Sequence, residues 1–340
     1  MQRIDGKRCA CSTLLHDGQK HSNQKNLRSD LLIMQGTVTK STGSWYHVLT
    51  DDGKVWLART RGKLRLNDLD TSNPVAVGDR VEMQADLNYP DTASISKVEP
   101  RNNYLIRRSN KLSSRRQILA TNLDGAALIA SLFSPRTSLG FIDRFILTCE
   151  AYHVPAAVFF NKMDLLGDNA AEFLSDIQHI YRNANVTVLM GSARDTTTLK
   201  PFAALLEGKR WLLAGHSGVG KSTLLNAVFP EANARVGNIS NHHEKGKHTT
   251  TFAEMFTLTN GTQIIDTPGI RDFGVVDFEP QEISQYFPEM RPYLNHCKFN
   301  DCQHTHEPEC AVLDALKKGE IAEERYHSYL GILNNEDIFE

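Results

Sequence analysis

Two nucleotide-binding motifs stand in reversed order along this chain, and that order constrains the fold more than any other feature. Residues 215–222 fit the phosphate-binding pattern G-x-x-x-x-G-K-[ST]. A base-reading tetrapeptide of the form Asn-Lys-x-Asp stands earlier, at residues 161–164. In ordinary domains that carry both motifs, the phosphate loop comes first. The domain is therefore predicted to be circularly permuted, so that the elements that usually come second in the chain come first.

The phosphate loop has the context that its pattern requires, because a strand-like run at residues 211–214 precedes it and a helix-like run at 223–228 follows. A chance glycine-rich turn, the alternative, would lack these flanks. Backbone N–H groups of such a loop surround phosphate oxygens at a helix N-terminus. Lys221 is expected to reach the β- and γ-phosphates, and the Ser222 hydroxyl to hold Mg²⁺. The predicted nucleotide-binding residues are Gly215, His216, Ser217, Gly218, Val219, Gly220, Lys221, Ser222 and Thr223.

The base-reading motif consists of Asn161, Lys162, Met163 and Asp164. It follows the buried-strand pattern of residues 156–160. The Asp164 carboxylate can accept hydrogen bonds from the ring N–H and the exocyclic amine of guanine, and adenine offers no such donor pair on that edge. Ser192 and Ala193 follow the next apolar strand and are expected to contact guanine O6 through backbone N–H groups. The motifs therefore predict a guanine nucleotide site.

The remaining elements of a GTP site follow the phosphate loop. Asp266 ends a strand-like run and opens the sequence Asp-Thr-Pro-Gly, which suits a carboxylate for a Mg²⁺-bound water and, at Gly269, an N–H for the γ-phosphate. The polar segment at residues 246–251 suits a first switch. In it Thr250 is expected to complete the Mg²⁺ shell, with Thr251 as the alternative.

Taken in this order, the motifs resemble those of the bacterial small-ribosomal-subunit-dependent GTPase A family, over residues 35–335. The resemblance implies an N-terminal OB-type β-barrel, a circularly permuted α/β P-loop GTPase domain and a C-terminal small α-helical zinc-binding domain. It also implies hydrolysis of GTP to GDP and phosphate, stimulated by the small ribosomal subunit during late maturation. Hydrolysis or phosphate release would be coupled to dissociation from the subunit and its rRNA.

Length and composition agree with several domains. A chain of 340 residues is too long for one ordinary core. We predict a disordered basic arm at 1–31, an OB-fold RNA-binding barrel at 32–100, the GTPase domain at 101–275 and a zinc-binding and C-terminal helical domain at 276–340. No apolar run could span a bilayer, and no signal peptide opens the chain, so a cytoplasmic monomer without a membrane partner is expected.

The barrel is predicted from five short strand patterns between residues 32 and 100. One hairpin and its exit combine Trp56 with basic residues, which suits an RNA surface. The alternative places Trp56 in the core, with the charges solvating an edge strand. A run without acids at 101–123 is a second candidate for phosphate binding or a solvated loop. The basic residues are Lys54, Arg59, Arg61, Lys63 and Arg65 in the first group, and Arg101, Arg107, Arg108, Lys111, Arg115 and Arg116 in the second.

A cysteine and histidine cluster near the C-terminus has the spacing C-x₄-C-x-H-x₅-C. Four soft or borderline ligands within fourteen residues are enough for a closed tetrahedral Zn²⁺ site, and such a site is structural. His296 and His306 are alternative ligands, and unrelated reduced thiols are the alternative to a metal site. The family resemblance selects Cys297, Cys302, His304 and Cys310.

Three functions are compatible with these motifs. The first is a GTPase that acts in assembly of the small ribosomal subunit. The second is another P-loop enzyme, such as a metabolic kinase, which the guanine-reading motif disfavours. The third is a passive RNA-binding module whose nucleotide site only stabilises the fold, and GTP turnover with ribosomal subunits separates it from the first.

The residue that orients the attacking water is predicted to be His248. Ile270 occupies the position where many GTPases place a glutamine, and an apolar side chain cannot hold water, so hydrolysis without a partner should be slow. A solvated loop histidine is the alternative. In subunit-stimulated turnover assays, His248→Ala should lose hydrolysis while keeping GTP affinity. An unchanged rate would remove His248 from catalysis.

Overall fold

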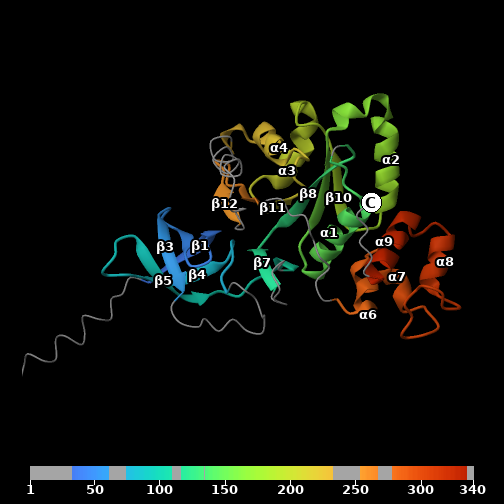
Figure 1. The fold of residues 1–340 in the computed structure, drawn as a ribbon, viewed down its shortest axis with the longest axis horizontal. Helices are drawn as coiled ribbons and strands as arrows, with labels where there is room; N and C mark the ends of the chain where they lie inside the picture. The colour runs from blue at the N-terminus through green and yellow to red at the C-terminus, as the bar shows by residue number, and fades with distance from the viewer. Residues whose placement is uncertain are drawn as a thin grey trace, which may run out of the picture.

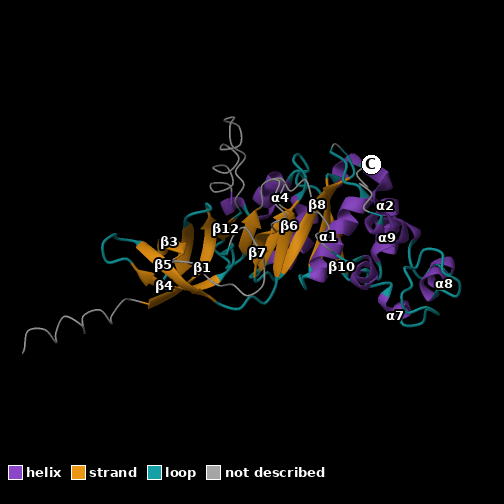
Figure 2. Ribbon diagram, turned by 60° about the horizontal axis from the view of Figure 1, so that its bottom comes forward, coloured by secondary structure: helices purple, strands orange, loops and turns teal. Residues whose placement is uncertain are grey.

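The computed structural model describes residues 33–60, 74–108, 116–133, 135–232, 253–266 and 278–334. A β-barrel lies at one end of the molecule, an α/β layer structure in the middle and a helical module at the other end (Figure 1). The strands of the barrel and of the central sheet are hydrogen-bonded into one continuous run (Figure 2). They meet where β1 (Ile33–Ser41) pairs with β12 (Glu254–Thr257) at Lys40 and Glu254, whose side chains form an ion pair of 2.8 Å.

The barrel closes on itself. Its five strands are β1 (Ile33–Ser41), β2 (Tyr46–Thr50), β3 (Val55–Thr60), β4 (Arg80–Ala85) and β5 (Thr92–Val98). They run in the order β1-β2-β3-β5-β4, and an additional β1–β4 pairing joins the ends, as in an OB-type barrel. All five strands fall on the segments predicted from the sequence. Trp56 is buried in the barrel core, which favours the structural alternative for that side chain.

A short hairpin joins the barrel to the central domain. It consists of β6 (Tyr104–Arg108) and β7 (Arg116–Thr121). Ahead of it, the Arg101 guanidinium donates to both carboxylate oxygens of the fully buried Asp79, at 2.7 and 2.8 Å. Arg101 therefore fastens the hairpin to the barrel. It is not free for the phosphate contact that the basic run suggested.

The central sheet is built mainly from parallel strands. These are β8 (Gly125–Ser131), β9 (Ala156–Asn161), β10 (Val186–Met190), β11 (Arg210–Ala214), β12 (Glu254–Thr257) and β13 (Gln263–Asp266). Their order is β10-β9-β8-β11-β13-β12, with only β12 antiparallel to its neighbour. The strand of this sheet that comes first in the chain, β8, thus lies in the middle of the sheet.

Helices cover both faces of this sheet, and alternate strand residues point to the two faces. On one face Ala126, Leu128 and Ala130 pack with helices α1 (Leu139–Ala151) and α2 (Ala170–Tyr181). On the other face Ala127 and Ile129 pack with α3 (Lys200–Leu206) and α4 (Lys221–Val228). Short 3-10 helices occupy the connections Met163–Leu165, Gly167–Asn169, Thr196–Leu199 and Pro230–Ala232.

The helical module contains α6 (Pro280–Ile283), a 3-10 turn (Ser284–Tyr286), α7 (Arg291–Leu294), α8 (Ala311–Lys317) and α9 (Glu323–Leu333). Its core includes Leu147 of α1, so the module packs directly on the central domain. Of the helices described, none is both long and apolar enough to cross a membrane. The predicted domain boundaries remain predictions.

A buried ion network holds the module against α1. The Arg325 guanidinium of α9 donates to Asp143 of α1 and to Glu289, both at 2.6 Å, and all three side chains are at most 4% exposed. Burial by itself would lower the pKa of Arg325, but the two carboxylates outweigh it and raise that pKa. Burial, and then the charge of Asp143, raise the pKa of the neighbouring Tyr181, which stays neutral.

We expect Arg325→Met to destabilise the protein by about 3–5 kcal/mol, because it leaves two buried carboxylates without their cation. Denaturant unfolding measures this loss. Lys317→Met, which removes a cation of the same module whose side chain is 76% exposed, should stay within about 0.5 kcal/mol of wild type. A loss below about 1 kcal/mol for Arg325→Met would show that the network is not the anchor of the module.

Candidate functional site

Four loops that are far apart in the chain meet at one edge of the central sheet. Strand β9 ends at Asn161, β10 at Met190, β11 at Ala214 and β13 at Asp266. These strands are parallel, so their carboxyl ends lie on the same edge, where open α/β sheets bind ligands. The structure therefore brings together the base motif, the Ser-Ala loop, the phosphate loop and Asp266.

The phosphate loop has a backbone that only glycine adopts readily. Gly215, Gly218 and Gly220 have φ angles of 154°, 88° and 89°. A Cβ atom added at Gly220 would lie 2.6 Å from the Asn161 side-chain nitrogen, so the base motif presses directly on this loop. Lys221 then begins α4, whose N-terminus follows the loop as the phosphate-binding pattern requires.

The base motif grips the phosphate loop through two side chains. The Asn161 amide donates to the Val219 carbonyl at 2.9 Å and accepts from the Ala193 N–H at 3.1 Å. The Lys162 ammonium donates to the Gly218 carbonyl at 2.9 Å. Asn161 is 3% exposed, so its own two bonds are shielded from water, whereas the Lys162 bond is exposed. The first two residues of the motif therefore join three loops.

Asp164 makes no bond to the phosphate loop among the described residues and stays partly exposed. The Ser192 hydroxyl donates to one of its carboxylate oxygens at 2.6 Å, and Arg194 lies 3.5 Å from the other. The Asp164 side chain keeps 30% of its surface exposed. A partly exposed carboxylate that a hydroxyl holds in place is suited to accept the donor pair of a planar base.

Lys221 and Asp266 form an ion pair at the end of β13, with side chains 13% and 14% exposed. The phosphate lysine and the carboxylate expected near Mg²⁺ are thus adjacent. Ser222 and Thr223 lie in the first turn of α4 beside this pair. His248, Thr250, Thr251 and Gly269 lie outside the described residues, as do Arg61, Lys63 and Arg65.

Two contacts behind the phosphate loop were not predicted from the sequence. The His216 ring stacks on Phe141 of α1, with ring centroids 4.1 Å apart. A Cβ atom added at Gly218 would lie 3.3 Å from Pro135, which belongs to the loop between β8 and α1. Phe141 and Pro135 belong to no motif, and each stands more than 70 positions before the phosphate loop. Only the fold could show that this loop and α1 support the nucleotide motif.

The four predicted zinc ligands form one cluster, in which the ligand atoms of Cys297, Cys302, His304 and Cys310 lie within 4.8 Å of one another. The Cys297 and Cys310 sulfurs are 3.9 Å apart, and each is 3.5 Å from the His304 Nδ1. Tetrahedral Zn²⁺ with its usual bond lengths would place these atoms about 3.5–3.8 Å apart. The donor set and its geometry therefore fit zinc.

The cysteine thiols of this cluster would be deprotonated only if a metal cation were bound. Burial raises the pKa of Cys302 to about 12 and lowers the pKa of His304. A bound divalent metal reverses this preference for the thiols, because it stabilises the deprotonated sulfur. His304 is already favoured in the neutral form that coordinates a metal.

A carboxylate shapes the loop that carries His304, and sequence reasoning missed it. Glu307 accepts from the backbone N–H groups of Gln303 and Thr305 at 2.8 Å and of His306 at 3.1 Å. Burial alone would raise the pKa of Glu307, but these donors outweigh it and lower the pKa to about 2. From the other side, the Tyr326 hydroxyl donates to the His304 carbonyl at 2.8 Å. An acid two or three residues after a ligand is a weak signal in sequence.

Comparison with known proteins settles the family. The family described as RsgA GTPase matches residues 98–276, and the RsgA N-terminal domain matches residues 35–89. The chain belongs to the RsgA GTPase family. It is thus a GTPase by descent, and the resemblance inferred from the motifs is confirmed.

Relatives match over nearly their full length. The small ribosomal subunit biogenesis GTPase RsgA 2 of Bacteroides thetaiotaomicron is 46% identical over 304 residues, which are 89% of this chain and 97% of the relative. The RsgA of Porphyromonas gingivalis is 46% identical over 307 residues, covering 89% and 98%. The chain therefore spans the length of these relatives.

Solved structures share the fold. YjeQ from Thermotoga maritima has a TM-score of 0.70 at 31% identity, covering 89% of this chain and 98% of YjeQ. YloQ, described as a circularly permuted GTPase, has a TM-score of 0.67 at 29% identity, covering 91% and 96%. The predicted fold class, a barrel followed by a permuted GTPase domain and a helical module with a Cys₃His cluster, is confirmed.

We expect Cys302→Ser to lower the zinc content of the purified protein and to open the helical module to protease, because a bound metal would cross-link residues 297–310. GTP affinity should change little, since the nucleotide loops lie at the sheet edge. Metal analysis and limited proteolysis test this. Cys149→Ala, at a buried cysteine of α1 outside the cluster, serves as control and should retain zinc. Wild-type protein that is free of zinc yet resists protease would contradict the assignment.

Proposed function

We propose that this protein is a GTPase that binds the small ribosomal subunit and assists its late maturation. The observation that carries the proposal is the grip of Asn161 and Lys162 on the phosphate loop, which makes base motif and phosphate motif a single site in permuted order. The names of the relatives, small ribosomal subunit biogenesis GTPases, supply the partner. Turnover would be stimulated by the subunit and would precede release from it.

Guanine selection rests with Asp164 and the Ser-Ala loop. The Asp164 carboxylate accepts from the guanine ring N–H and amine, while Ser192 holds the carboxylate in place at 2.6 Å. The two backbone N–H groups expected to meet guanine O6 have other partners in the described structure, since Ala193 donates to Asn161 and Ser192 donates to the Thr198 hydroxyl. Contact with O6 would require one of them to be shared or released. Adenine would leave the carboxylate without donors, and unpaired polar groups of this kind are strongly discriminating.

The triphosphate would lie along residues 215–223, with backbone N–H groups around its oxygens. Lys221 would leave Asp266 to meet the β- and γ-phosphates, and Asp266 would then face the metal-bound water. Ser222, and Thr250 of the first switch, would hold Mg²⁺, which when bound neutralises charge that develops on the phosphates. Gly269 would meet the γ-phosphate through its N–H, and His248 is proposed to orient the attacking water.

The Cys₃His cluster is proposed to hold one structural zinc, because its four protein donors leave no position for substrate. Contact with rRNA is assigned to the barrel and its basic hairpin. Two members of that group are described. The Arg59 guanidinium lies over the Trp45 ring at 5.7 Å, and the Lys54 ammonium lies over the Trp56 ring at 4.3 Å and pairs with Asp91. A passive RNA-binding module would share these features but would not turn over GTP.

The decisive experiment measures GTP turnover with and without purified small ribosomal subunits. The proposal expects slow turnover alone and a clear increase with subunits. Equal rates would favour the passive module, and phosphate transfer from ATP to a small molecule would favour a kinase. Large ribosomal subunits, at equal concentration, control for general effects of RNA.

Asp164→Asn is expected to weaken GTP binding about tenfold to a hundredfold, because a charge-assisted pair of hydrogen bonds is lost. Xanthosine triphosphate should bind the variant better than GTP, since its C2 oxygen can accept from the new amide. Asp168→Asn, in the next turn, is the matched control and should bind GTP as wild type does. Unchanged GTP affinity in Asp164→Asn would show that this carboxylate does not read the base.

A further inference from the structure

Charge is divided sharply along this chain. Residues 276–340 contain five Lys and Arg against fourteen Asp and Glu, a balance of −9. The preceding 275 residues contain 33 basic and 26 acidic residues, a balance of +7. A strongly acidic module repels nucleic acid phosphates and attracts cationic partners. The basic part of the chain suits rRNA, and the helical module suits a partner of the opposite charge.

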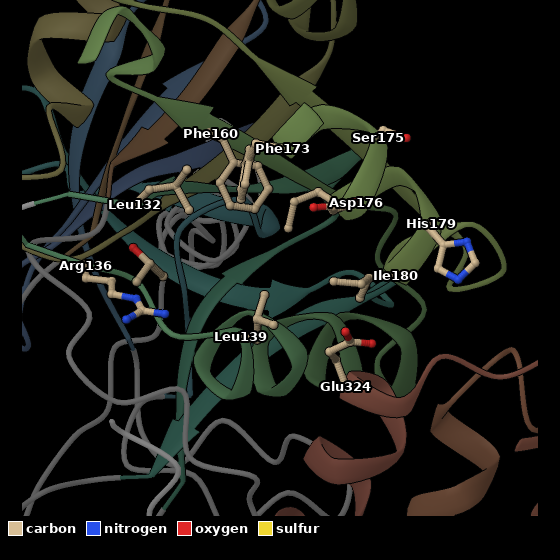
Figure 3. Close-up of a pocket in the computed structure, with 12 residues that line it drawn as sticks. Leu132, Arg136, Leu139, Phe160, Phe173, Ser175, Asp176, His179, Ile180 and Glu324 are labelled. Atoms are coloured by element: carbon tan, nitrogen blue, oxygen red, sulfur yellow. The ribbon is translucent and has the colours of Figure 1, made fainter. Parts of the chain in front are cut away.

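A cavity lies where this acidic module meets the central domain. Its volume is about 500 Å³, within the range of ligand-binding pockets. Its lining combines apolar and polar side chains, which come from the loop after β8, from β9, and from α1, α2 and α9 (Figure 3). The apolar lining residues are Leu132, Leu139, Phe160, Phe173, Ile177 and Ile180.

The rim of this cavity is charged and polarised. Asp176 of α2 and Glu324 of α9 lie on the side of the helical module, and Arg136 lies at the opposite end (Figure 3). Both acidic residues are exposed, and among the described residues neither forms an ion pair. Two carboxylates beside an apolar hollow present free charge to an incoming group.

The cavity also borders the nucleotide site from behind. Phe160 directly precedes Asn161 of the base motif. Pro135 lies in the loop that supplies Leu132 and Arg136, and a Cβ atom added at Gly218 of the phosphate loop would lie 3.3 Å from it. An occupant would therefore contact the supports of both nucleotide motifs and, through Glu324, the helical module.

We propose that this cavity docks a lysine- and arginine-rich protein segment that carries an apolar anchor, supplied by a protein of the small ribosomal subunit. The apolar side chains of the segment enter the hollow, and its cations lie beside Asp176 and Glu324. The identity of the source rests on the proposed function. The chain's own C-terminus does not suit the site, since residues 335–340 contain three acids.

The test uses full-length protein and a fluorescein-labelled octapeptide, Arg-Lys-Leu-Phe-Lys-Leu-Arg-Lys, in fluorescence polarisation without subunits or nucleotide. Asp176→Lys combined with Glu324→Lys should weaken binding about tenfold or more, because attraction becomes repulsion. The matched control combines Glu172→Lys with Glu323→Lys, which makes the same charge change on the same helices outside the cavity. It should alter affinity less than about threefold.

A second peptide, in which serine replaces the three apolar residues, separates docking from plain charge attraction and should bind about tenfold more weakly. The proposal is overturned if wild-type protein binds neither peptide, or if it binds both peptides equally well. It is also overturned if both double variants lose peptide affinity to the same extent. A third variant replaces the six basic residues of the N-terminal arm with serine. If this variant binds the peptide more tightly than wild type, the arm itself occupies the cavity, and the proposal is overturned.

Small-subunit association of the two double variants then distinguishes this inference from the proposed function. If subunits fail to stimulate wild-type turnover, the proposed function fails whatever the peptide does. If wild type is stimulated and Asp176→Lys with Glu324→Lys associates as tightly as its control, only the docking site fails. Loss of association in that variant alone, with unstimulated turnover unchanged, supports the docking site.

Discussion

The side-chain amide of Asn161 is the contact on which the nucleotide site depends. It is almost fully buried, donates to Val219 and accepts from Ala193, and it lies where any side chain at Gly220 would stand. An amide is one of the few groups that can do both at once, because it carries a donor and an acceptor on one rigid plane. The phosphate loop, the base motif and the Ser-Ala loop are therefore positioned by each other rather than separately.

The sequence was sufficient wherever a local pattern carries its own geometry. The glycines of the phosphate loop, the alternating strands of the barrel and the cysteine spacing each predicted a structure that was found. It was not sufficient where partners come from distant segments. Trp56 and Arg101 were candidates for RNA contact, yet Trp56 packs in the barrel core and Arg101 neutralises Asp79. Whether such a side chain contacts RNA or packs inside the protein depends on its burial, which a short stretch of sequence does not reveal.

The same limit explains the supports that were missed. Phe141 beneath His216, and Arg325 between Asp143 and Glu289, are ordinary core and surface residue types in sequence. Together they make α1 a common support, with the phosphate loop on one end and the helical module along its side.

The central position of β8 has a consequence for how the protein is made. During synthesis β8 and β9 emerge together and can pair at once, but the other edge of β8 waits for β11, about eighty residues later. An open edge in the middle of a sheet is prone to wrong pairing, and distant closure is slow. The phosphate loop is formed only by that closing strand. The nucleotide site therefore cannot form until β11 and the loop that follows it have been synthesised.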